Sequence, residues 1–180
     1  DKTSFTTLVT LNKINKILYK KNKDYYSRRP TKKELNELYK ISSNFWDSIF
    51  ETYPEIKKYI NGASDIKIGD NKISRKSSDG GSLLLRPIGQ EIIAIAYSKF
   101  KINEINEFKE KIKKIDFNLS HDYWKYVFWN EKMLGKEIRL KKALILKLMG
   151  KPIPNYDLEK EMNRVYKLYG KNFNLSIDAV

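Results

Sequence analysis

The chain has 180 residues, of which 41% are hydrophobic and 13% aromatic, so it can form a buried core and fits one domain. It contains 36 Lys and Arg residues against 22 Asp and Glu residues, and the net charge of +14 favours a polyanionic partner. The absence of cysteine excludes disulfides, iron–sulfur clusters and a cysteine nucleophile. A single histidine, His121, excludes a histidine-rich metal centre.

The sequence also predicts a compartment. No apolar run reaches the roughly 20 residues that cross a bilayer, and no signal-peptide pattern opens the chain. We therefore expect a soluble, cytoplasmic protein with no membrane contact. The chain begins at Asp1 without an initiator methionine and runs straight into a helical pattern, so we expect it to be the C-terminal part of a longer protein.

The first third of the chain reads as helices. Apolar residues recur at three- and four-residue steps over 3–23, and a basic loop with two tyrosines follows over 20–30. Thr31 with Glu34 fits a capping box, which predicts the start of a second helix whose apolar stripe reaches residue 50. A short helix is expected over 55–60, after Pro54.

In the middle, isoleucines alternate with polar residues over 65–74, which predicts either a small β-hairpin or an ordered loop. Residues 83–85 form a buried leucine run before Arg86 and Pro87, and helices are expected over 88–101 and 103–114.

The last third reads as three helices. Ser120 is expected to cap a short aromatic helix over 120–128, and Gly150 to end a compact helix over 138–149. An extended linker over 151–156 then leads to a terminal helix, 158–169, capped by Asp157. The predicted fold is mostly α, a single helical domain over 1–180 with about seven helices and at most one small hairpin.

Catalytic chemistry has little support in the sequence. No GxGxxG, Walker A or HExxH pattern occurs, and nothing arranges serine, histidine and acid as a triad. His121 beside Asp122 reads as a turn cap or a surface residue rather than a general base. We predict no catalytic residue, no metal and no cofactor, and leave open whether the chain belongs to an enzyme.

The basic residues are the candidate site. Most of them are lysines in a chain rich in Asn and Ile, so the charge is explained equally by a compositional bias on a solvated surface and by a nucleic-acid surface. Arginine is more informative because its planar guanidinium can donate two parallel hydrogen bonds to one phosphate. The candidates for phosphate contact, with two tyrosines as stacking groups, are Arg28, Arg29, Arg75, Lys76, Arg86, Tyr25 and Tyr26.

Each candidate also has a structural interpretation. For the Tyr25–Tyr26 loop, a mobile, merely soluble loop is the simpler alternative. Arg86 is equally an anchor that pairs with an acid and fixes the helix end, while Gly89 permits close packing. Trp46, Trp124 and Trp129 lie among aliphatic residues, which favours core packing over base stacking.

Several blocks resemble one protein family. Residues 80–81 (Gly-Gly) and 84–91 (Leu-Leu-Arg-Pro-Ile-Gly-Gln-Glu) resemble a motif in the C-terminal part of DGQHR-domain proteins. This family includes the DndB-like proteins associated with DNA phosphorothioate modification. Residues 3–8, 44–47 with 53–55, and 123–130 with 144–150 resemble further segments of the family. The Asp-Gly-Gln-His-Arg signature itself is absent, so the resemblance concerns the helical C-terminal region only.

The resemblance implies a bacterial protein of a DNA-modification or defence locus that binds DNA or regulates transcription. The leading hypothesis is a DNA-associated helical domain whose basic face contacts the nucleic-acid backbone. The alternative is a scaffold that packs on an N-terminal DGQHR-type domain or on another subunit, with the aromatic set around Trp124 and Trp129 as its interface. A third hypothesis is an enzyme whose site Arg86 or His121 completes. The sequence does not decide between DNA and RNA.

Overall fold

The computed structural model describes residues 5–19, 28–62, 66–68, 71–73 and 80–179. The fold is mostly α-helical, as predicted. The α-helices of the described residues are α1 (Leu8–Leu18), α2 (Lys32–Thr52), α3 (Glu55–Ile60), α4 (Pro87–Tyr97), α5 (Ile105–Lys114), α6 (Ile138–Leu148) and α7 (Leu158–Lys167). Two 3₁₀ turns, η2 (Leu83–Leu85) and η3 (Ile102–Glu104), precede α4 and α5.

Two small antiparallel pairs complete the secondary structure. Strands β1 (Ile66–Ile68) and β2 (Asn71–Ile73) pair with Ile66 opposite Ile73, which confirms the hairpin interpretation of 65–74. Strands β3 (Trp129–Asn130) and β4 (Lys132–Met133) form a second pair that the sequence did not reveal. Each is two residues long, which is too short for an alternating pattern to register.

Local signals at helix ends act as expected. The Thr31 hydroxyl accepts a hydrogen bond from the Glu34 amide, and the Glu34 carboxylate accepts one from the Thr31 amide, which is the predicted capping box. Asp157 caps α7 by accepting from the Lys160 amide. At the end of α6, Gly150 adopts φ +67°, and the amides of Gly150 and Lys151 bond back to the last turn in a Schellman motif.

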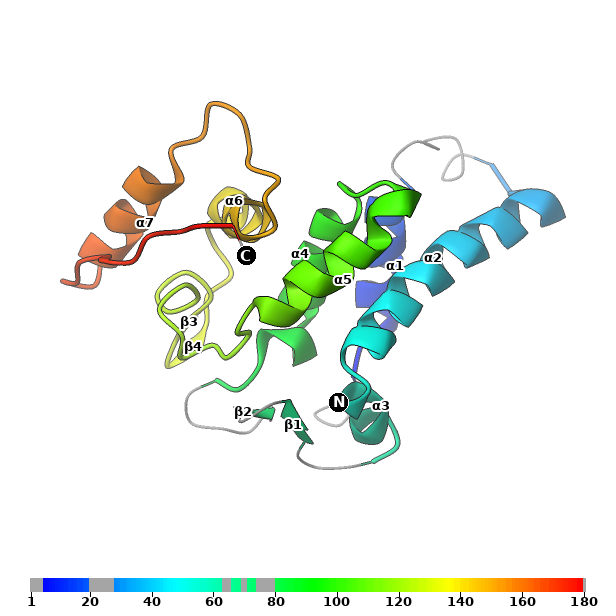
Figure 1. The fold of residues 1–180 in the computed structure, drawn as a ribbon, viewed down its shortest axis with the longest axis horizontal. Coiled ribbons are helices and arrows are strands. Elements are labelled where there is room, and N and C mark those ends of the chain that lie inside the picture. Colours follow the sequence, from blue (N-terminus) through cyan, green and yellow to red (C-terminus); the bar gives the residue numbers. More distant parts are fainter. Residues whose placement is uncertain (1–4, 20–27, 63–65, 69–70, 74–79, 180) are drawn as a thin grey trace.

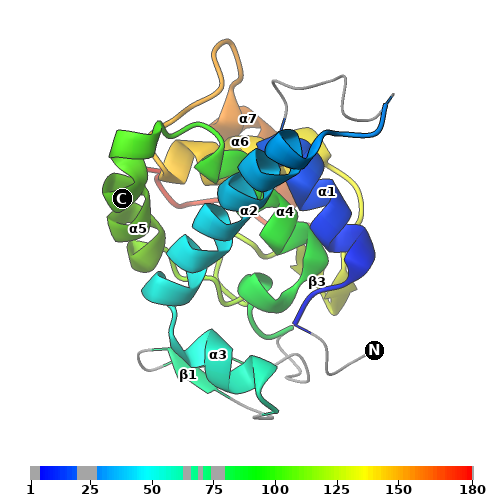
Figure 2. The ribbon, with the colours of Figure 1, turned by 90° about the vertical axis from the view of Figure 1, so that its right-hand side faces the viewer.

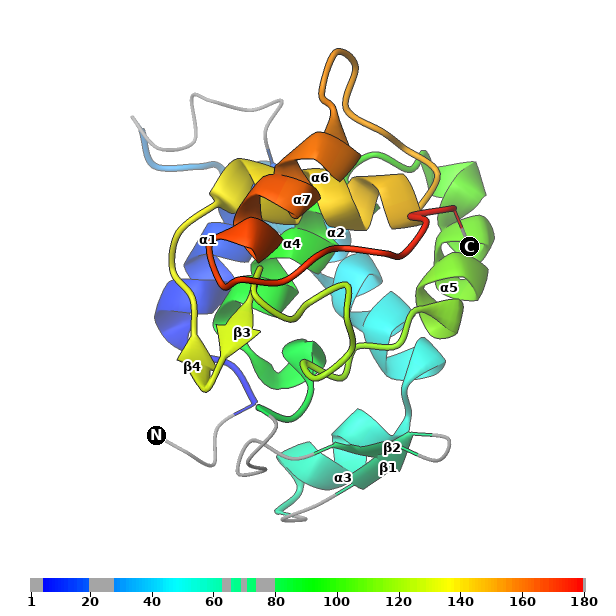
Figure 3. The same cartoon turned by 90° about the vertical axis from the view of Figure 1, so that its left-hand side faces the viewer.

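The helices share one apolar core. α4 lies in the middle, with α1 and α2 to one side and α6 and α7 to the other (Figure 1). In the view from the right-hand side of Figure 1, α1 and α2 lie in front (Figure 2). In the view from its left-hand side, α7 and the C-terminal segment lie in front, beside β3 and β4 (Figure 3). The buried apolar side chains form one cluster from Phe5 to Ile177. The segment between α6 and α7 lacks regular structure, but its Ile153 and Tyr156 pack on this cluster.

The Leu-Leu-Leu-Arg-Pro motif is a packing device. A Cβ at Gly89 would lie 2.0 Å from the Leu83 carbonyl oxygen, so only glycine allows α4 to approach η2 this closely. The buried Gln90 amide donates to the carbonyls of Phe5 at 2.9 Å and Leu84 at 3.2 Å. These contacts tie the start of the described chain to the central helix, and the close approach at Gly89 is the packing role expected for that glycine.

The predicted helix over 120–128 is wrong. This segment forms a series of turns, and Tyr126 has the left-handed φ of +61°, which ends any right-handed helix. The Tyr126 amide donates to the Trp129 carbonyl at 2.7 Å instead of to a residue four positions earlier. The apolar spacing that suggested a helix is satisfied differently, because the turns bury Trp124, Val127 and Phe128 together.

Within the described residues, no helix combines the length and the apolar character needed to span a bilayer.

Candidate nucleic-acid interface

The structure describes three of the seven sequence-predicted site residues, Arg28, Arg29 and Arg86. The other four, Tyr25, Tyr26, Arg75 and Lys76, lie outside the described residues. The chain that leads into α2 and the η2–α4 junction lie far apart in all three views (Figures 1–3). Arg28 and Arg29 therefore do not form one site with Arg86.

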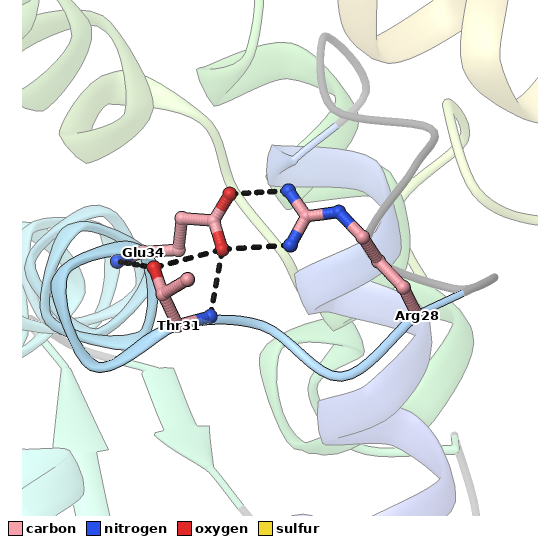
Figure 4. A network of polar contacts seen from close by, with 3 residues as sticks. All are labelled: Arg28, Thr31 and Glu34. Carbon is pink, nitrogen blue, oxygen red and sulfur yellow. Dashed lines mark hydrogen bonds and ion pairs between the residues drawn. The ribbon is translucent and has the colours of Figure 1, made fainter.

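Arg28 is part of the cap of α2. Its guanidinium donates to both carboxylate oxygens of Glu34, at 3.0 and 2.5 Å, while Glu34 also accepts from Thr31 (Figure 4). The hydrogen bond from Arg28 and the bond from the Thr31 amide lower the pKa of Glu34 to about 2. Arg28 and Arg29 are both exposed, but a phosphate at Arg28 would compete with its two hydrogen bonds to Glu34.

Arg86 is half-buried and holds an internal contact. Its Nη2 donates to the Gly80 carbonyl at 2.6 Å, and its guanidinium carbon lies 5.9 Å from the centre of the Trp129 ring. Gly80 packs against the same indole so closely that a Cβ there would lie 2.6 Å from it. Arg86 thus joins the chain before η2 to strand β3.

The other sequence candidates have structural roles. Trp124 is fully buried and its indole N–H donates to the Asp116 carbonyl at 2.6 Å, so this tryptophan belongs to the core, whereas Trp129 is half-buried. His121 caps a turn, since its Nδ1 accepts from the Tyr123 amide at 3.2 Å. No cluster of three or more metal-ligating side chains occurs among the described residues.

A different surface combines lysines with aromatic rings. Tyr126 in the turns over 121–128 is half-buried, and its ring stacks on Tyr169 after α7 with centroids 4.9 Å apart and planes at 24°. Tyr166 meets the Tyr126 ring edge-on at 5.0 Å. The stack is held in place because Trp124 and Phe128, on either side of Tyr126 in the sequence, are both buried in the core.

Tyr126 lies between two hollows. The first, of 310 Å³, is lined by Lys125 and Lys171 together with polar and aromatic side chains from 122–126 and 166–175. The second, of 410 Å³, lies between the β3–β4 region and the end of α7 and is lined by Lys132 and Lys136. Tyr126 borders both. We call this region the Tyr126 surface, and it comprises Lys125, Tyr126, Lys132, Lys136, Tyr169 and Lys171.

The four lysines of the Tyr126 surface are exposed, and none forms an ion pair within the described part of the chain. Lys125 Nζ lies 5.6 Å from the centre of the Tyr126 ring. Glu137, which also lines the second hollow, is paired with Arg164 at 2.9 Å. Glu137 is therefore neutralised by Arg164, whereas Asp122 in the first hollow and Glu131 beside Lys132 are exposed carboxylates near the same lysines.

Sequence reasoning missed this surface because it assigned 120–128 to a helix. A helix over these residues gave no reason to expect the Tyr126 ring beside Tyr166 and Tyr169. The available signal was the alternation of Lys125, Tyr126 and later lysines around a charged turn, the same pattern that drew attention to Tyr25 and Tyr26.

A groove on the opposite side of the molecule is apolar. It has a volume of 570 Å³ and lies between α1, α2 and the end of α3. Tyr39 beside it is 73% exposed, and Leu8 at the start of α1 is 85% exposed. Its principal apolar lining consists of Phe5, Leu11, Tyr39, Trp46, Phe50 and Ile60. Trp46 was expected in the core, and it is half-buried here with one side on this groove.

Comparison with known proteins gives no match to a family model, to a curated protein or to a solved structure. The resemblance to DGQHR-domain proteins is therefore not tested by these comparisons and stays a prediction.

Proposed function

We propose that this chain is a DNA-associated helical domain that contacts the nucleic-acid backbone through the Tyr126 surface, and that it has no catalytic step of its own. The observation that carries the proposal is the set of four exposed lysines without ion-pair partners, grouped around two surface tyrosines. Lysine provides a mobile charge for phosphate, and a tyrosine ring provides a platform for a base.

The net charge of +14 supports the same proposal through long-range attraction. Arg29 and the sequence-predicted Tyr25, Tyr26, Arg75 and Lys76 stay predictions and are not counted among the contacts of the Tyr126 surface. A role in a bacterial DNA-modification or defence locus, as a DndB-like regulator, follows from the family resemblance and belongs to the same proposal.

The test is fluorescence anisotropy with a labelled random-sequence DNA duplex over a salt series. Each neutralised phosphate releases counterions, so four lysine contacts predict a slope of log affinity against log salt near −3.6, roughly −0.9 per contact. A binding constant that does not change between low and moderate salt would refute the proposal.

A matched pair of variants localises the binding. The quadruple variant Lys125→Gln, Lys132→Gln, Lys136→Gln, Lys171→Gln should bind more weakly and with a shallower slope. The control removes the same charge from α2 and α3, on the other side of α4: Lys33→Gln, Lys40→Gln, Lys57→Gln, Lys58→Gln. These four lysines are also exposed, and none forms an ion pair with another described residue. Equal weakening by both variants would show diffuse attraction rather than a binding surface.

The second candidate function is that of a scaffold, and the apolar groove between α1 and α2 favours it. We take a second copy of this chain as its occupant, since Tyr39 and Ile60, which line the groove and are exposed, are the kind of side chains that isologous dimers bury. Size-exclusion chromatography with light scattering checks it: a dimer that Tyr39→Asp dissociates, with no DNA affinity, would replace the first proposal.

A further inference from the structure

The first hollow of the Tyr126 surface is a pocket, whereas contact with a nucleic-acid backbone requires only exposed cations. Its 310 Å³ lies at the lower end of the range of ligand pockets, about 300–1,000 Å³. It is lined by Asp122, Lys125, Tyr126, Tyr166, Lys171, Asn172, Phe173, Asn174 and Leu175. We call it the Tyr126 pocket.

The aromatic side chains that line the pocket are held in place by contacts with one another. Tyr166 is buried and meets both Tyr126, at 5.0 Å, and Phe173, at 5.1 Å, edge-on. The Tyr166 hydroxyl donates to the Asp122 carbonyl, and burial raises the pKa of this phenol, which keeps the hydroxyl a donor. Because these rings are held before any ligand arrives, binding against them costs little ordering entropy.

The polar side chains that line the pocket match the remaining parts of a nucleotide. Lys125 and Lys171 stand at the pocket as exposed cations, suited to phosphate. Asp122 offers a carboxylate acceptor, and Asn172 and Asn174 offer both amide donors and acceptors, which is the chemistry that base edges read.

A paired base cannot use such a pocket. In a duplex both faces of a base are stacked and its edge is paired, so only an unpaired base can reach an aromatic wall and polar groups at once. We propose that the Tyr126 pocket binds one unpaired nucleotide, with the base on its aromatic side chains and the phosphate at Lys125 and Lys171. The protein then prefers single strands to duplexes. This inference rests on the proposed function and deepens it.

The experiment compares three labelled probes at one salt concentration: a 15-nucleotide single strand, an abasic strand of the same length and charge, and a duplex. The wild-type protein should bind the base-bearing strand about tenfold more tightly than the abasic strand, since stacking of a base on an aromatic side chain contributes roughly 1–3 kcal/mol. The duplex should bind like the abasic strand.

A variant then assigns the difference to the pocket. Tyr126→Asn removes the ring and keeps a residue that adopts the left-handed φ of +61°. It should abolish the advantage of the base-bearing strand, whereas Tyr39→Asn, an exposed tyrosine on α2, should retain it. Circular dichroism checks that both variants fold.

The outcomes separate the two proposals. Equal affinity for all three probes would overturn the nucleotide pocket. Backbone binding would stay intact if the duplex salt series showed a steep slope. Absence of binding to every probe at low salt would overturn both. An advantage of the base-bearing strand that Tyr126→Asn leaves unchanged would also overturn the pocket, because the base would then bind elsewhere.

Discussion

The Arg86 junction and the Tyr126 surface each place a cation near an aromatic ring, but the Arg86 cation is half-buried and the Lys125 cation is exposed. At the junction, the Arg86 cation is held by the Gly80 carbonyl and faces the Trp129 ring, so cation and ring serve each other. At the Tyr126 surface, the lysines have no carboxylate partner in the described chain, and the rings of Tyr126 and Tyr169 stack at the surface. A basic residue near an aromatic ring thus indicates binding only where its other contacts leave it accessible.

The largest expected effect breaks the junction. Gly89→Ala places a Cβ about where the Leu83 backbone carbonyl lies, and backbone cannot move aside as a flexible side chain would. We expect the free energy of unfolding to fall by about 3 kcal/mol or more. Urea denaturation measures it, with Gly135→Ala as the control because no atom lies within 4 Å of a Cβ there. Equal stability of the two variants would contradict the packing role.

Arg86 gives the next largest effect. Arg86→Ala removes a charge-assisted hydrogen bond from a half-buried carbonyl contact, so we expect the free energy of unfolding to fall by about 2 kcal/mol. The exposed Arg29→Ala should change it by less than about 0.5 kcal/mol. DNA affinity of folded Arg86→Ala protein should remain close to wild type. Unchanged stability with lost DNA affinity would make Arg86 a phosphate contact, as the alternative interpretation of the sequence had it.

Lys141 supports the loop that leads from β4 into α6, and its protonation gives a pH test. Its buried ammonium donates to the Leu134 carbonyl and lies 5.1 Å from the Phe128 ring centre, and burial lowers its pKa to about 8. The unfolded chain then binds more protons than the folded protein between pH 8 and about 10.5, so the contribution of this lysine to stability rises with pH there.

Between pH 7 and pH 9.5, wild-type protein should therefore gain about 2 kcal/mol relative to Lys141→Met. Urea denaturation at both pH values measures the change, with Lys142→Met as the half-buried neighbour that should show none of it. A constant difference between wild type and Lys141→Met would mean that the pKa of Lys141 is normal.

The smallest expected change in stability concerns two lysines of the Tyr126 surface. Lys125→Gln with Lys171→Gln should alter the free energy of unfolding by less than about 0.5 kcal/mol, because neither lysine has an ion-pair partner within the described residues. The same variant should weaken DNA binding and reduce the salt slope by about 2. Loss of stability without loss of affinity would assign these lysines to the fold.

Most of the fold could be predicted because local signals decided it. Thr31 with Glu34, Asp157 and Gly150 mark helix ends through contacts within a few residues, which a sequence shows directly. The segment 120–128 could not be predicted, since the left-handed Tyr126 depends on contacts with Tyr166 and Tyr169, which lie far along the chain. Its apolar spacing is the same as that of a helix.

The candidate site was less predictable for the same reason. Arg28 is accounted for by the cap of α2, and the pairing of Arg86 with a carbonyl rather than an acid depends on where Gly80 lies. The two hollows bring 122–126 together with 171–175 and with β4, segments that no spacing rule connects. Composition predicted that lysines and tyrosines matter, and only the tertiary structure indicates which.

The most direct test of the central claim is lysine acetylation with and without a DNA strand, read by mass spectrometry for every lysine. The account predicts that DNA protects Lys125, Lys132, Lys136 and Lys171, while Lys33, Lys40, Lys57 and Lys58 react as in free protein. Equal protection of both sets, or protection of neither set while DNA is bound, would contradict a binding surface around Tyr126.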